Sequence, residues 1–381
     1  MQDSDFLPFT RPFIDDDTID AVSEVLRSGW LSSGPKVLAF ENALSACLEG
    51  RVVRVVNSGS AALQLALQVC DIGQGDEVIT TPLSWVATAN IILTNGATPV
   101  FVDVDANTRN IDLSLLESFI TINTRAIIPV DLAGFPVDRD KLYEIANKYQ
   151  LRVIEDAAQS LGARWNKKPI GSFGDLVAFS FHANKNVTTG EGGCLVMSNA
   201  DEVELFEKLR LHGTTKLTNG LLDCEALGGK FNLTDIAATI GMGQLTQLEK
   251  FNKRRSELAK LYFKYFNQSL DCSLPLADFE QTNWHMFQIL LPPKLVYKQG
   301  RENFVKGMRK LGIGIGIHYP AIHKLTLYKM KGYRADSCPI AEDIANRIVT
   351  LPLFPTMQDS DVIRVCEAIT RVLQPMLEDR V

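Results

Sequence analysis

Short segments rich in Val and Ile alternate with longer segments of helical length, and this alternation constrains the fold more than any other feature of the chain. The apolar segments cover residues 77–81, 99–104, 126–130 and 152–156, and turn or polar residues bound each of them. Such short apolar runs are typical of strands that are buried on both faces of a sheet. Between them lie helix-length segments such as residues 138–150. Buried strands that alternate with helices predict a βαβ series and a mainly parallel sheet.

A different pattern begins after this series. Residues 234–266 have helical spacing almost throughout, which predicts one long helix that bridges two domains. Beyond it, residues 285–292 and 312–320 are predicted as strands. We therefore predict an α/β fold with a large domain over residues 1–250 and a smaller α+β domain over residues 251–381.

The charge and hydropathy of the chain disfavour two classes of partner. Its 381 residues include 39 Lys and Arg against 45 Asp and Glu, whereas a nucleic-acid binder relies on clustered positive charge. The most apolar long window, residues 85–104, is interrupted by Pro99 and Asp103, so it does not form the span of about 20 apolar residues that a bilayer requires. The start of the chain lacks a basic segment followed by an apolar stretch, so we expect no signal peptide. We predict no nucleic-acid and no membrane partner.

The seven cysteines are scattered and include no CxxC pair. An odd, dispersed set is typical of reduced thiols in the cytoplasm and lacks the spacing of a zinc site or a disulfide framework. We therefore predict a cytoplasmic protein without a bound metal.

A lysine in a polar turn is the strongest candidate for a reactive group. Residues 178–181 are strand-like, and Lys185 lies in the turn that follows them. A lysine in such a turn is usually a solvated surface residue. Here Ser180, His182 and Asn184 surround it with polar groups beside a predicted buried strand. A lysine held near buried structure has a lowered amine pKa, which suits a Schiff-base nucleophile.

Asp156 comes at the carboxyl end of a predicted buried strand, where open α/β sheets bind ligands. Two interpretations stay open from the residues alone. The carboxylate caps a helix that follows it, or it pairs with the protonated nitrogen of a pyridine ring and keeps that ring electron-withdrawing. Gln159 would lie on the same helical face and reach the same ligand.

A Ser/Gly-rich helix start and an aromatic residue add two weaker signals. Ser58, Gly59 and Ser60 begin a segment with helical spacing, so free backbone N–H groups and hydroxyls converge where a phosphate is favoured. Trp85 follows the first strand of the series. Core packing is the usual role of such a residue, and stacking on a flat cofactor is the alternative.

Phosphate site, aromatic, carboxylate and lysine follow one another in the order expected of a fold-type I pyridoxal-phosphate enzyme. Longer motifs extend the match over essentially the whole chain: NSGSAAL, TTPLSWVATAN, FVDVD, VIEDAAQSLGA, SFHANKN, GEGG, KFNLTDIAATIGMGQL and GIHYP. Together they resemble the DegT/StrS family of sugar aminotransferases. The resemblance implies a fold-type I transferase with a seven-stranded, mainly parallel sheet between helices. It also implies pyridoxal 5'-phosphate as the cofactor, with pyridoxamine phosphate in the cycle.

The resemblance assigns roles around the cofactor ring. Lys185 would bind the cofactor covalently and later move protons, and Asp156 would hold the pyridine nitrogen protonated. Gln159 would contact the oxygen side of the ring, Trp85 would stack on its face, and His182 would lie beside it. Lys185, Asp156 and His182 are thus the catalytic residues that the resemblance implies.

Four further residues are implied in binding the cofactor phosphate. Ser60, the backbone of Ala61 and Ser180 would hold it within one chain. Asn232 would reach the phosphate bound by the neighbouring subunit. Each active site would then need two chains of a homodimer.

The resemblance also places a substrate pocket. His318 and Tyr319 would face the substrate, and an N-terminal segment with Trp30, Ser32 and Ser33 would line the sugar.

Within the family, LRSGWLSSGPKV, SFHANKN and LPLFP are most similar to the subgroup that forms UDP-4-amino-4-deoxy-L-arabinose. That subgroup carries Phe where this chain has Tyr319, and often His where it has Gln159. Both positions lie in the substrate or cofactor shell, so the identity of the sugar stays open.

Three functions are weighed on these grounds. The first is transfer of an amino group from an amino acid, with L-glutamate as the donor, to a keto group of a nucleotide-linked sugar, for cell-surface polysaccharide or lipid A-type glycan synthesis. The second is a pyridoxal-phosphate-dependent nucleotide-sugar dehydratase on the same fold, but those relatives carry His in place of the lysine, so Lys185 argues against it. The third is a non-catalytic regulator, for which the sequence shows no basic run. We predict the first.

Overall fold

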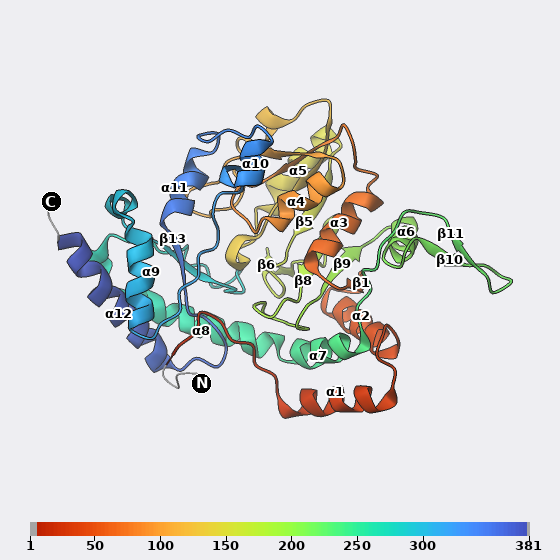
Figure 1. The fold of residues 1–381 in the computed structure, drawn as a ribbon, viewed down its shortest axis with the longest axis horizontal. Helices are drawn as coiled ribbons and strands as arrows, with labels where there is room; N and C mark the ends of the chain where they lie inside the picture. The colour runs from red at the N-terminus through yellow and green to blue at the C-terminus, as the bar shows by residue number, and fades with distance from the viewer. Residues whose placement is uncertain (1–5, 379–381) are drawn as a thin grey trace.

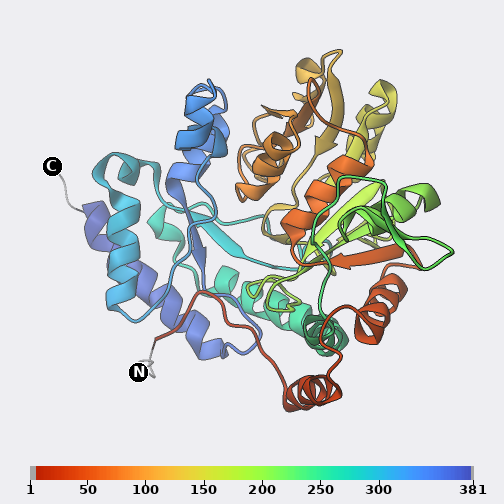
Figure 2. The same cartoon turned by 45° about the vertical axis from the view of Figure 1, so that its right-hand side comes forward.

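A seven-stranded sheet forms the centre of the larger part of the protein (Figures 1 and 2). The computed structural model describes residues 6–378, apart from the side chains of residues 297 and 298. The strands of this sheet are β1 (Val52–Val56), β2 (Glu77–Thr80), β3 (Thr98–Phe101), β4 (Thr124–Ile128), β5 (Arg152–Asp156), β8 (Leu176–Ser180) and β9 (Gly193–Met197). They lie in the order β1-β9-β8-β5-β4-β2-β3, and only β9 runs antiparallel to its neighbours. The predicted fold class is confirmed.

The sequence predicts the strands that are rich in Val and Ile better than the segments that are rich in Gly. β2 and β5 lie on predicted segments, and β3 and β4 begin one and two residues earlier. The sequence analysis missed β1 and β9, and β9 begins at Gly193 in a Gly-rich stretch. The prediction of a strand at residues 312–320 is wrong, because that segment forms only single bridges at Ile313 and Gly316. Its glycines offer no side chains to a pleated surface, and Gly312 has a φ of 74°.

Helices cover both faces of the sheet. The α-helices of the described chain are α1 (Asp16–Ser28), α2 (Pro35–Cys47), α3 (Gly59–Val69), α4 (Ala87–Thr94), α5 (Arg139–Tyr149), α6 (Ala200–Leu209), α7 (Asp235–Thr246), α8 (Leu248–Tyr265), α9 (Gly300–Lys310), α10 (Thr326–Met330), α11 (Pro339–Arg347) and α12 (Asp359–Glu378). Val78 and Ile154 are buried against α3, α4 and α6. Their chain neighbours Ile79 and Val153 are buried on the other face, against α5. The strands are therefore apolar on both faces, as their composition predicts.

Two consecutive helices connect the sheet to the C-terminal part of the chain. The sequence predicts one helix over residues 234–266, whereas the structure divides it at Gln247, which has φ −101° and ψ 0°. α7 packs on α1 and α2, and α8 packs on α12. The carboxylate of Asp235 in α7 also accepts hydrogen bonds from the N–H groups of Gly34 (2.8 Å) and Val37 (3.0 Å) at the start of α2. This buried cap fastens the N-terminal segment to α7.

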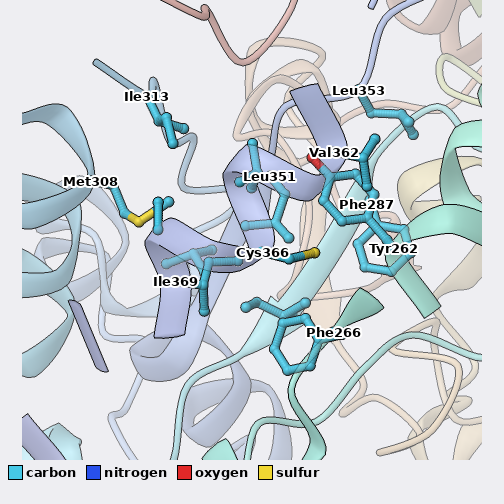
Figure 3. Close-up of a cluster of buried hydrophobic side chains, with 14 of the residues drawn as sticks. Tyr262, Phe266, Phe287, Met308, Ile313, Leu351, Leu353, Val362, Cys366 and Ile369 are labelled. Atoms are coloured by element: carbon cyan, nitrogen blue, oxygen red, sulfur yellow. The ribbon is translucent and has the colours of Figure 1, made fainter. Parts of the chain in front are cut away.

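The C-terminal part has a hydrophobic core of its own around a two-stranded antiparallel sheet (Figure 3). Strand β12 (Phe287–Leu290) pairs with β13 (Ile348–Leu351), and α8, α9 and α12 surround them. The buried side chains include Tyr262, Phe266, Phe287, Met308, Leu351, Val362 and Ile369. The N-terminal segment lies on this part as well, because the N–H of Leu7 donates to the carbonyl of Gly312 at 2.8 Å. The division into domains at residue 250 stays a prediction.

The two parts meet along a seam that contains α10 and α11. The hydroxyl of Tyr328 in α10 donates to Asn90 Oδ1 in α4 at 2.8 Å. Asp103, two residues after β3, accepts from the N–H groups at the start of α11, including that of Ala341 at 2.8 Å. The remaining short strands are β6 (Arg164–Trp165), β7 (Lys168–Pro169), β10 (Thr214–Lys216) and β11 (Leu222–Cys224). Within residues 6–378, none of the helices has the length and hydropathy to cross a membrane.

Candidate active site

The predicted catalytic residues gather where β5 and β8 end, at one edge of the sheet. Asp156 is the last residue of β5, and Ser180 is the last residue of β8. The turn after β8 carries Lys185, whose N–H donates to the carbonyl of His182 at 2.9 Å. Parallel strands bring their carboxyl ends to the same edge, and open α/β sheets bind ligands there.

Asp156 is buried, and hydrogen bonds fix its carboxylate. The hydroxyl of Thr88 in α4 donates to Oδ2 at 2.7 Å, and the N–H of Ala158 donates to Oδ1 at 3.2 Å. Burial raises the pKa of Asp156 above its ordinary value, and these hydrogen bonds and the charge of Lys185 oppose the rise. A buried carboxylate of this kind is stabilised by a cation that binds beside it.

The interpretation of Asp156 as a helix cap is wrong. Residues 157–163 form turns and no helix. The side chain of Ser160 donates to Asp131 at 2.6 Å, and Gly162 has a φ of 82°. Both features compete with a helical backbone, so Gln159 is not placed by a helical face.

The amine of Lys185 is half-buried, near Asp156. Burial lowers the pKa of Lys185 to about 8, and the negative charge of Asp156 opposes that shift. At pH 7 about a tenth of this amine is unprotonated, against less than about a thousandth for a solvated lysine. An amine in this state serves both as a nucleophile and as a proton carrier.

The first turn of α3 presents free backbone donors to the same edge. The Oγ atom of Ser58 accepts the N–H of Ala61 at 3.1 Å and so caps the helix. In the described part of the chain, the N–H groups of Gly59 and Ser60 have no hydrogen-bond partner. The N–H of Ala61 is thus already used by the cap, and its role in binding phosphate stays a prediction. Two free donors at a helix N-terminus form an anion site.

Two glycines allow three backbone segments to meet at this anion site. A Cβ atom at Gly59 would lie 2.8 Å from the Cβ of Ser180. A Cβ atom at Gly193 would lie 2.5 Å from the nitrogen of Gly59. The starts of α3 and β9 and the end of β8 therefore lie close together, and the Ser180 hydroxyl lies beside the first turn of α3.

Gln159 and Trp85 lie differently in the site. Gln159 is buried, and its Oε1 accepts the N–H of Ala133 at 2.8 Å. This bond uses the amide oxygen, so a ligand would meet the N–H donors of the amide. The side chain of Trp85 is 59% exposed, and its ring centroid lies 6.0 Å from that of Tyr319. An exposed indole with one aromatic neighbour can stack on a further ring.

His318 and Tyr319 are uncharged groups at the active site. Burial lowers the pKa of His318 to about 4, and the positive charge of Lys185 adds to this effect. Burial raises the pKa of Tyr319, as does the negative charge of Asp156. The Nδ1 atom of His318 lies 2.9 Å from the hydroxyl of Thr350. At neutral pH both side chains act as neutral hydrogen-bonding groups.

The segment predicted to line the sugar contacts Asn232. The Nδ2 atom of Asn232 donates to the hydroxyl of Ser33 at 2.5 Å, while its Oδ1 is buried without a partner among the described residues. The backbone of Asn232 forms a bridge with Val56, the last residue of β1. Trp30 and Ser32 lie exposed in the same N-terminal segment. The structure thus places Asn232 next to the N-terminal segment that is predicted to line the sugar.

His182 lies at the exposed side of the lysine turn. Its Nδ1 is 2.9 Å from Asn184 Oδ1, and its Nε2 is 3.8 Å from a carboxylate oxygen of Glu191. The side chain is about half exposed, so the geometry of a single chain does not hold it against a cofactor. Its role beside the cofactor stays a prediction.

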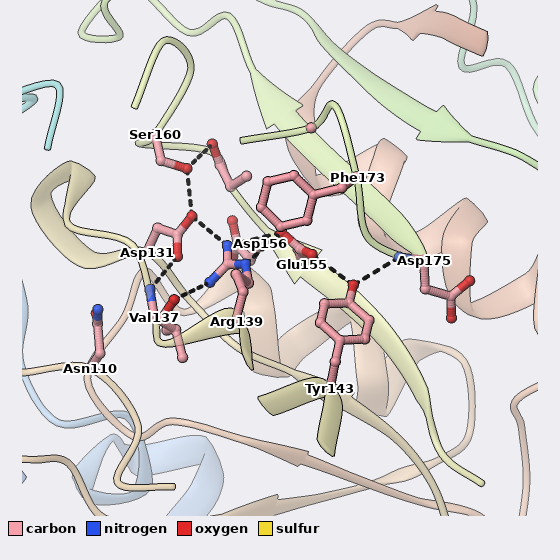
Figure 4. A network of polar contacts seen from close by, with 12 residues as sticks. Asn110, Asp131, Val137, Arg139, Tyr143, Glu155, Asp156, Ser160, Phe173 and Asp175 are labelled. Carbon is pink, nitrogen blue, oxygen red and sulfur yellow. Dashed lines mark hydrogen bonds and ion pairs between the residues drawn. The ribbon is translucent and has the colours of Figure 1, made fainter. Parts of the chain in front are cut away.

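A buried ionic network lies next to Asp156 (Figure 4). The sequence analysis did not predict it. The guanidinium of Arg139 pairs with Asp131 at 2.8 Å and with Glu155 at 2.9 Å. Asp131 also accepts the Ser160 hydroxyl, and its N–H donates to the carbonyl of Asp156 at 3.2 Å. Arg139 is the first residue of α5, a position that the sequence does not distinguish from the helix surface. The network joins the segment after β4, the start of α5 and the end of β5 next to Asp156.

These residues fit pyridoxal phosphate. The free N–H groups of Gly59 and Ser60 suit its phosphate, because they are donors without partners at a helix N-terminus. The buried Asp156 suits a cationic ring nitrogen, and Lys185 has the lowered amine pKa that its aldehyde requires. The site therefore defines a pyridoxal-phosphate-dependent enzyme of fold type I.

Comparison with known proteins leads to the same class. Residues 12–370 match the DegT/DnrJ/EryC1/StrS aminotransferase family. The solved structure of the putative sugar aminotransferase Spr1654 from Streptococcus pneumoniae, in its PMP form, is 32% identical with a TM-score of 0.92, covering 98% of both chains. Helicobacter pylori PseC, an aminotransferase involved in the biosynthesis of pseudoaminic acid, is 30% identical with a TM-score of 0.92, covering 97% of this chain and 100% of that one.

A curated relative has a more specific name. The UDP-4-amino-4-deoxy-L-arabinose–oxoglutarate aminotransferase of Shewanella sediminis is 37% identical over 387 residues, covering 97% of this chain and 99% of its own length. This chain belongs to the DegT/DnrJ/EryC1/StrS aminotransferase family. It is a pyridoxal-phosphate-dependent enzyme that transfers an amino group to the keto group of a sugar. The predictions of family, enzyme class and cofactor are confirmed.

Proposed function

We propose that this enzyme moves an amino group from L-glutamate to the keto carbon of a nucleotide-linked sugar. The observation that carries the proposal is the position of Lys185 and Asp156 at the same sheet edge, where their charges affect each other. One is an amine that releases its proton near neutral pH, and the other is a buried carboxylate that a cation stabilises. Pyridoxal phosphate supplies the electron sink that amino transfer needs.

Each of the two residues has a separate task in this reaction. Lys185 carries a proton to and from the reacting carbon, since an amine with a pKa of about 8 exchanges protons readily at physiological pH. Asp156, held by Thr88, would provide the negative charge that keeps the ring nitrogen protonated. A protonated ring nitrogen offsets the cost of burying this carboxylate, so each charge stabilises the other.

The surrounding groups suit a polar, uncharged substrate such as a sugar. His318 and Tyr319 stay neutral at pH 7 and offer hydrogen bonds without selecting for charge. Trp85 offers an apolar face beside them. We assign these three residues, together with Trp30 and Ser33, to the cofactor and sugar surfaces of the pocket.

We further propose a two-fold homodimer with shared active sites. Large apolar side chains are exposed on α1, on α2, on the segment between them, and on and just after the β10–β11 hairpin, which projects from the body (Figure 1). They are Ile19, Leu26, Trp30, Leu31, Leu38, Leu217, Leu221, Leu222 and Leu227. Apolar surface of this extent is typical of a protein interface. In the dimer, Asn232 from each chain would offer the second N–H of its Nδ2, which the bond to Ser33 leaves free, to the phosphate region of the other chain.

The setting we propose is the cytoplasm, in the synthesis of a cell-surface polysaccharide or a lipid A-type glycan. The seven cysteines are all free thiols, as a reducing compartment requires. The spacing of these cysteines is also far from that of a metal site.

An isotope experiment tests the reaction. The purified enzyme is incubated with 15N-labelled glutamate and with UDP-, dTDP- and GDP-linked keto sugars, one at a time. We expect 15N in an amino sugar nucleotide from one member of the panel, together with an equal amount of 2-oxoglutarate. A deoxy sugar without 15N would instead establish the dehydratase, and no change of any sugar with any amino acid donor would contradict the proposal.

A further inference from the structure

A buried histidine outside the predicted catalytic set lies next to the lysine turn. His285 is 4% exposed and comes two residues before β12, from the C-terminal part of the chain. Its Nδ1 lies 3.0 Å from Oδ1 of Asn186, the residue that follows Lys185. The two residues are 99 positions apart, so this contact joins distant parts of the chain.

The hydrogen bonds around Asn186 determine which ring nitrogen of His285 carries the proton. The Nδ2 group of Asn186 donates to Oδ1 of Asn252 at 2.7 Å and to the carbonyl of Asn283 at 3.2 Å. Both donors of the amide are therefore used, and its oxygen faces the imidazole as an acceptor. His285 must donate from Nδ1, which leaves Nε2 as an unprotonated acceptor.

The charges around His285 keep the ring neutral. Burial lowers its pKa well below the ordinary value, and positive charge at Lys185 and Arg255 lowers it further. Arg255 is itself buried, and its Nη1 donates to the carbonyl of His285 at 3.1 Å. Protonation on both nitrogens would place a second cation against these groups.

The free nitrogen of His285 lies beside a very small cavity. Its Nε2 is buried without a hydrogen-bond partner among residues 6–378. A cavity of about 10 Å³ is lined by His285, Asn184, Thr10 and Thr350, among others. This is about the space that one water molecule occupies, and the Thr350 hydroxyl that lines it also contacts His318.

We propose that His285 is a positioning residue for Lys185. Its imidazole is neutral and protonated on Nδ1, and through Asn186 it connects the lysine turn to the C-terminal part of the chain. Its Nε2 accepts a hydrogen bond from a water molecule beside Asn184. The backbone N–H of Lys185 donates to the carbonyl of His182, and the bonds of Asn186 to His285, Asn252 and Asn283 attach the turn to the rest of the chain. Loss of the Asn186 bond lets the turn move toward solvent, and solvation raises the pKa of a lysine. The inference rests on the proposed role of Lys185.

The first experiment determines the tautomer. The protein is labelled with 15N-histidine, and long-range proton–nitrogen spectra are recorded without cofactor, with His285→Asn to assign the signal. We expect His285 to be neutral and protonated on Nδ1 throughout pH 6 to 8. Protonation on Nε2, or on both nitrogens, would overturn the proposal. Neither the cofactor nor a sugar is present, so this result is independent of the substrate.

The second experiment separates the two sides of the ring. In His285→Asn, the amide nitrogen takes the place of Nδ1 and keeps the bond to Asn186. In His285→Gln, the amide lies at the place of Nε2, and that bond is lost. The pKa of Lys185 is read in the cofactor-free protein from the pH dependence of its labelling by an amine reagent, mapped by peptide mass.

The proposal expects a difference between these matched variants. His285→Asn should label as the wild type does. His285→Gln should raise the pKa of Lys185 by about one unit, which lowers labelling at pH 7 about tenfold, and Asn186→Leu should do the same from the other side of the bond. If the Asn and Gln variants behave alike, His285 does not position Lys185 through Asn186. Should the Gln and Leu variants fail to fold, the tautomer spectrum of the wild type decides alone.

Discussion

Removal of the Thr88 hydroxyl tests how the protein prepares its buried carboxylate. Thr88 donates to Asp156 at 2.7 Å, and both side chains are almost fully buried. Valine has nearly the same shape as threonine, so Thr88→Val adds no cavity and deletes the bond to Asp156, together with the hydroxyl contacts to Ser84 (3.0 Å) and to the carbonyl of Trp85 (3.1 Å). Hydrogen bonds to charged groups contribute about 1.5–3 kcal/mol. If this bond acts on the charge that the cofactor ring requires, kcat should fall roughly 10- to 100-fold.

The same variant has a signature in stability against pH. The hydroxyl stabilises the ionised form of Asp156, so its removal raises the pKa of Asp156 further above the ordinary value. The wild type should therefore exceed Thr88→Val in free energy of unfolding at neutral pH, and this excess should shrink as the pH falls through the pKa of Asp156, where the carboxyl becomes protonated in both. Urea denaturation of the cofactor-free proteins at several pH values measures the difference.

Thr88→Ser is the matched control because it keeps the hydroxyl. It should retain most of the activity and the stability of the wild type. If Thr88→Val turns over at the rate of Thr88→Ser, the hydroxyl does not prepare Asp156, and the electrostatic account of this carboxylate is wrong.

Three further predictions follow from the site. Asp156→Asn should fold but lose about 100-fold or more in kcat, since a contact that tunes the reacting centre is worth about 3 kcal/mol or more; near-normal turnover would leave Asp156 without a role in the chemistry. Mixed Lys185→Ala and Asn232→Ala chains, each inactive alone, should regain activity on subunit exchange, because one site of a mixed dimer keeps both residues; mixtures that stay inactive after proven exchange would refute the shared site. Arg139→Met should lower the free energy of unfolding by about 3–5 kcal/mol, because two buried carboxylates lose their partner; an unchanged urea midpoint would show that the network contributes little.

The sequence predicts those parts of the fold that depend on local composition. The sequence predicts strands close to the observed positions of β2, β3, β4 and β5, which contain β-branched residues. β9 includes Gly193 and Cys194 and follows a Gly-rich turn, so its composition does not resemble that of the other strands. At residues 312–316 the error is the reverse, because a strand is predicted where none forms. The glycines there alternate with isoleucines but have no side chains that could pack in a sheet.

The candidate site divides in the same way. Lys185 and Asp156 are predictable because Asp156 ends a recognisable strand and Lys185 lies in the turn after another. The sequence does not predict the roles of Thr88, Arg139 and His285. These roles depend on contacts with residues that are distant in the sequence, and no local pattern indicates such contacts. The position of Gln159 is a related case, since its bond to Ala133 depends on a turn that the sequence analysis took for a helix.

The covalent attachment of the cofactor to Lys185 is the most direct test of the account. The purified holoenzyme is treated with borohydride, which reduces and so fixes the link between the amine and the cofactor aldehyde, and the protein is then digested and its peptides are mapped by mass. The account predicts that the visible absorbance band disappears and that the added mass lies on the peptide that contains Lys185 and at no other lysine. Attachment to a different lysine, or a reduced protein without an adduct, would contradict it.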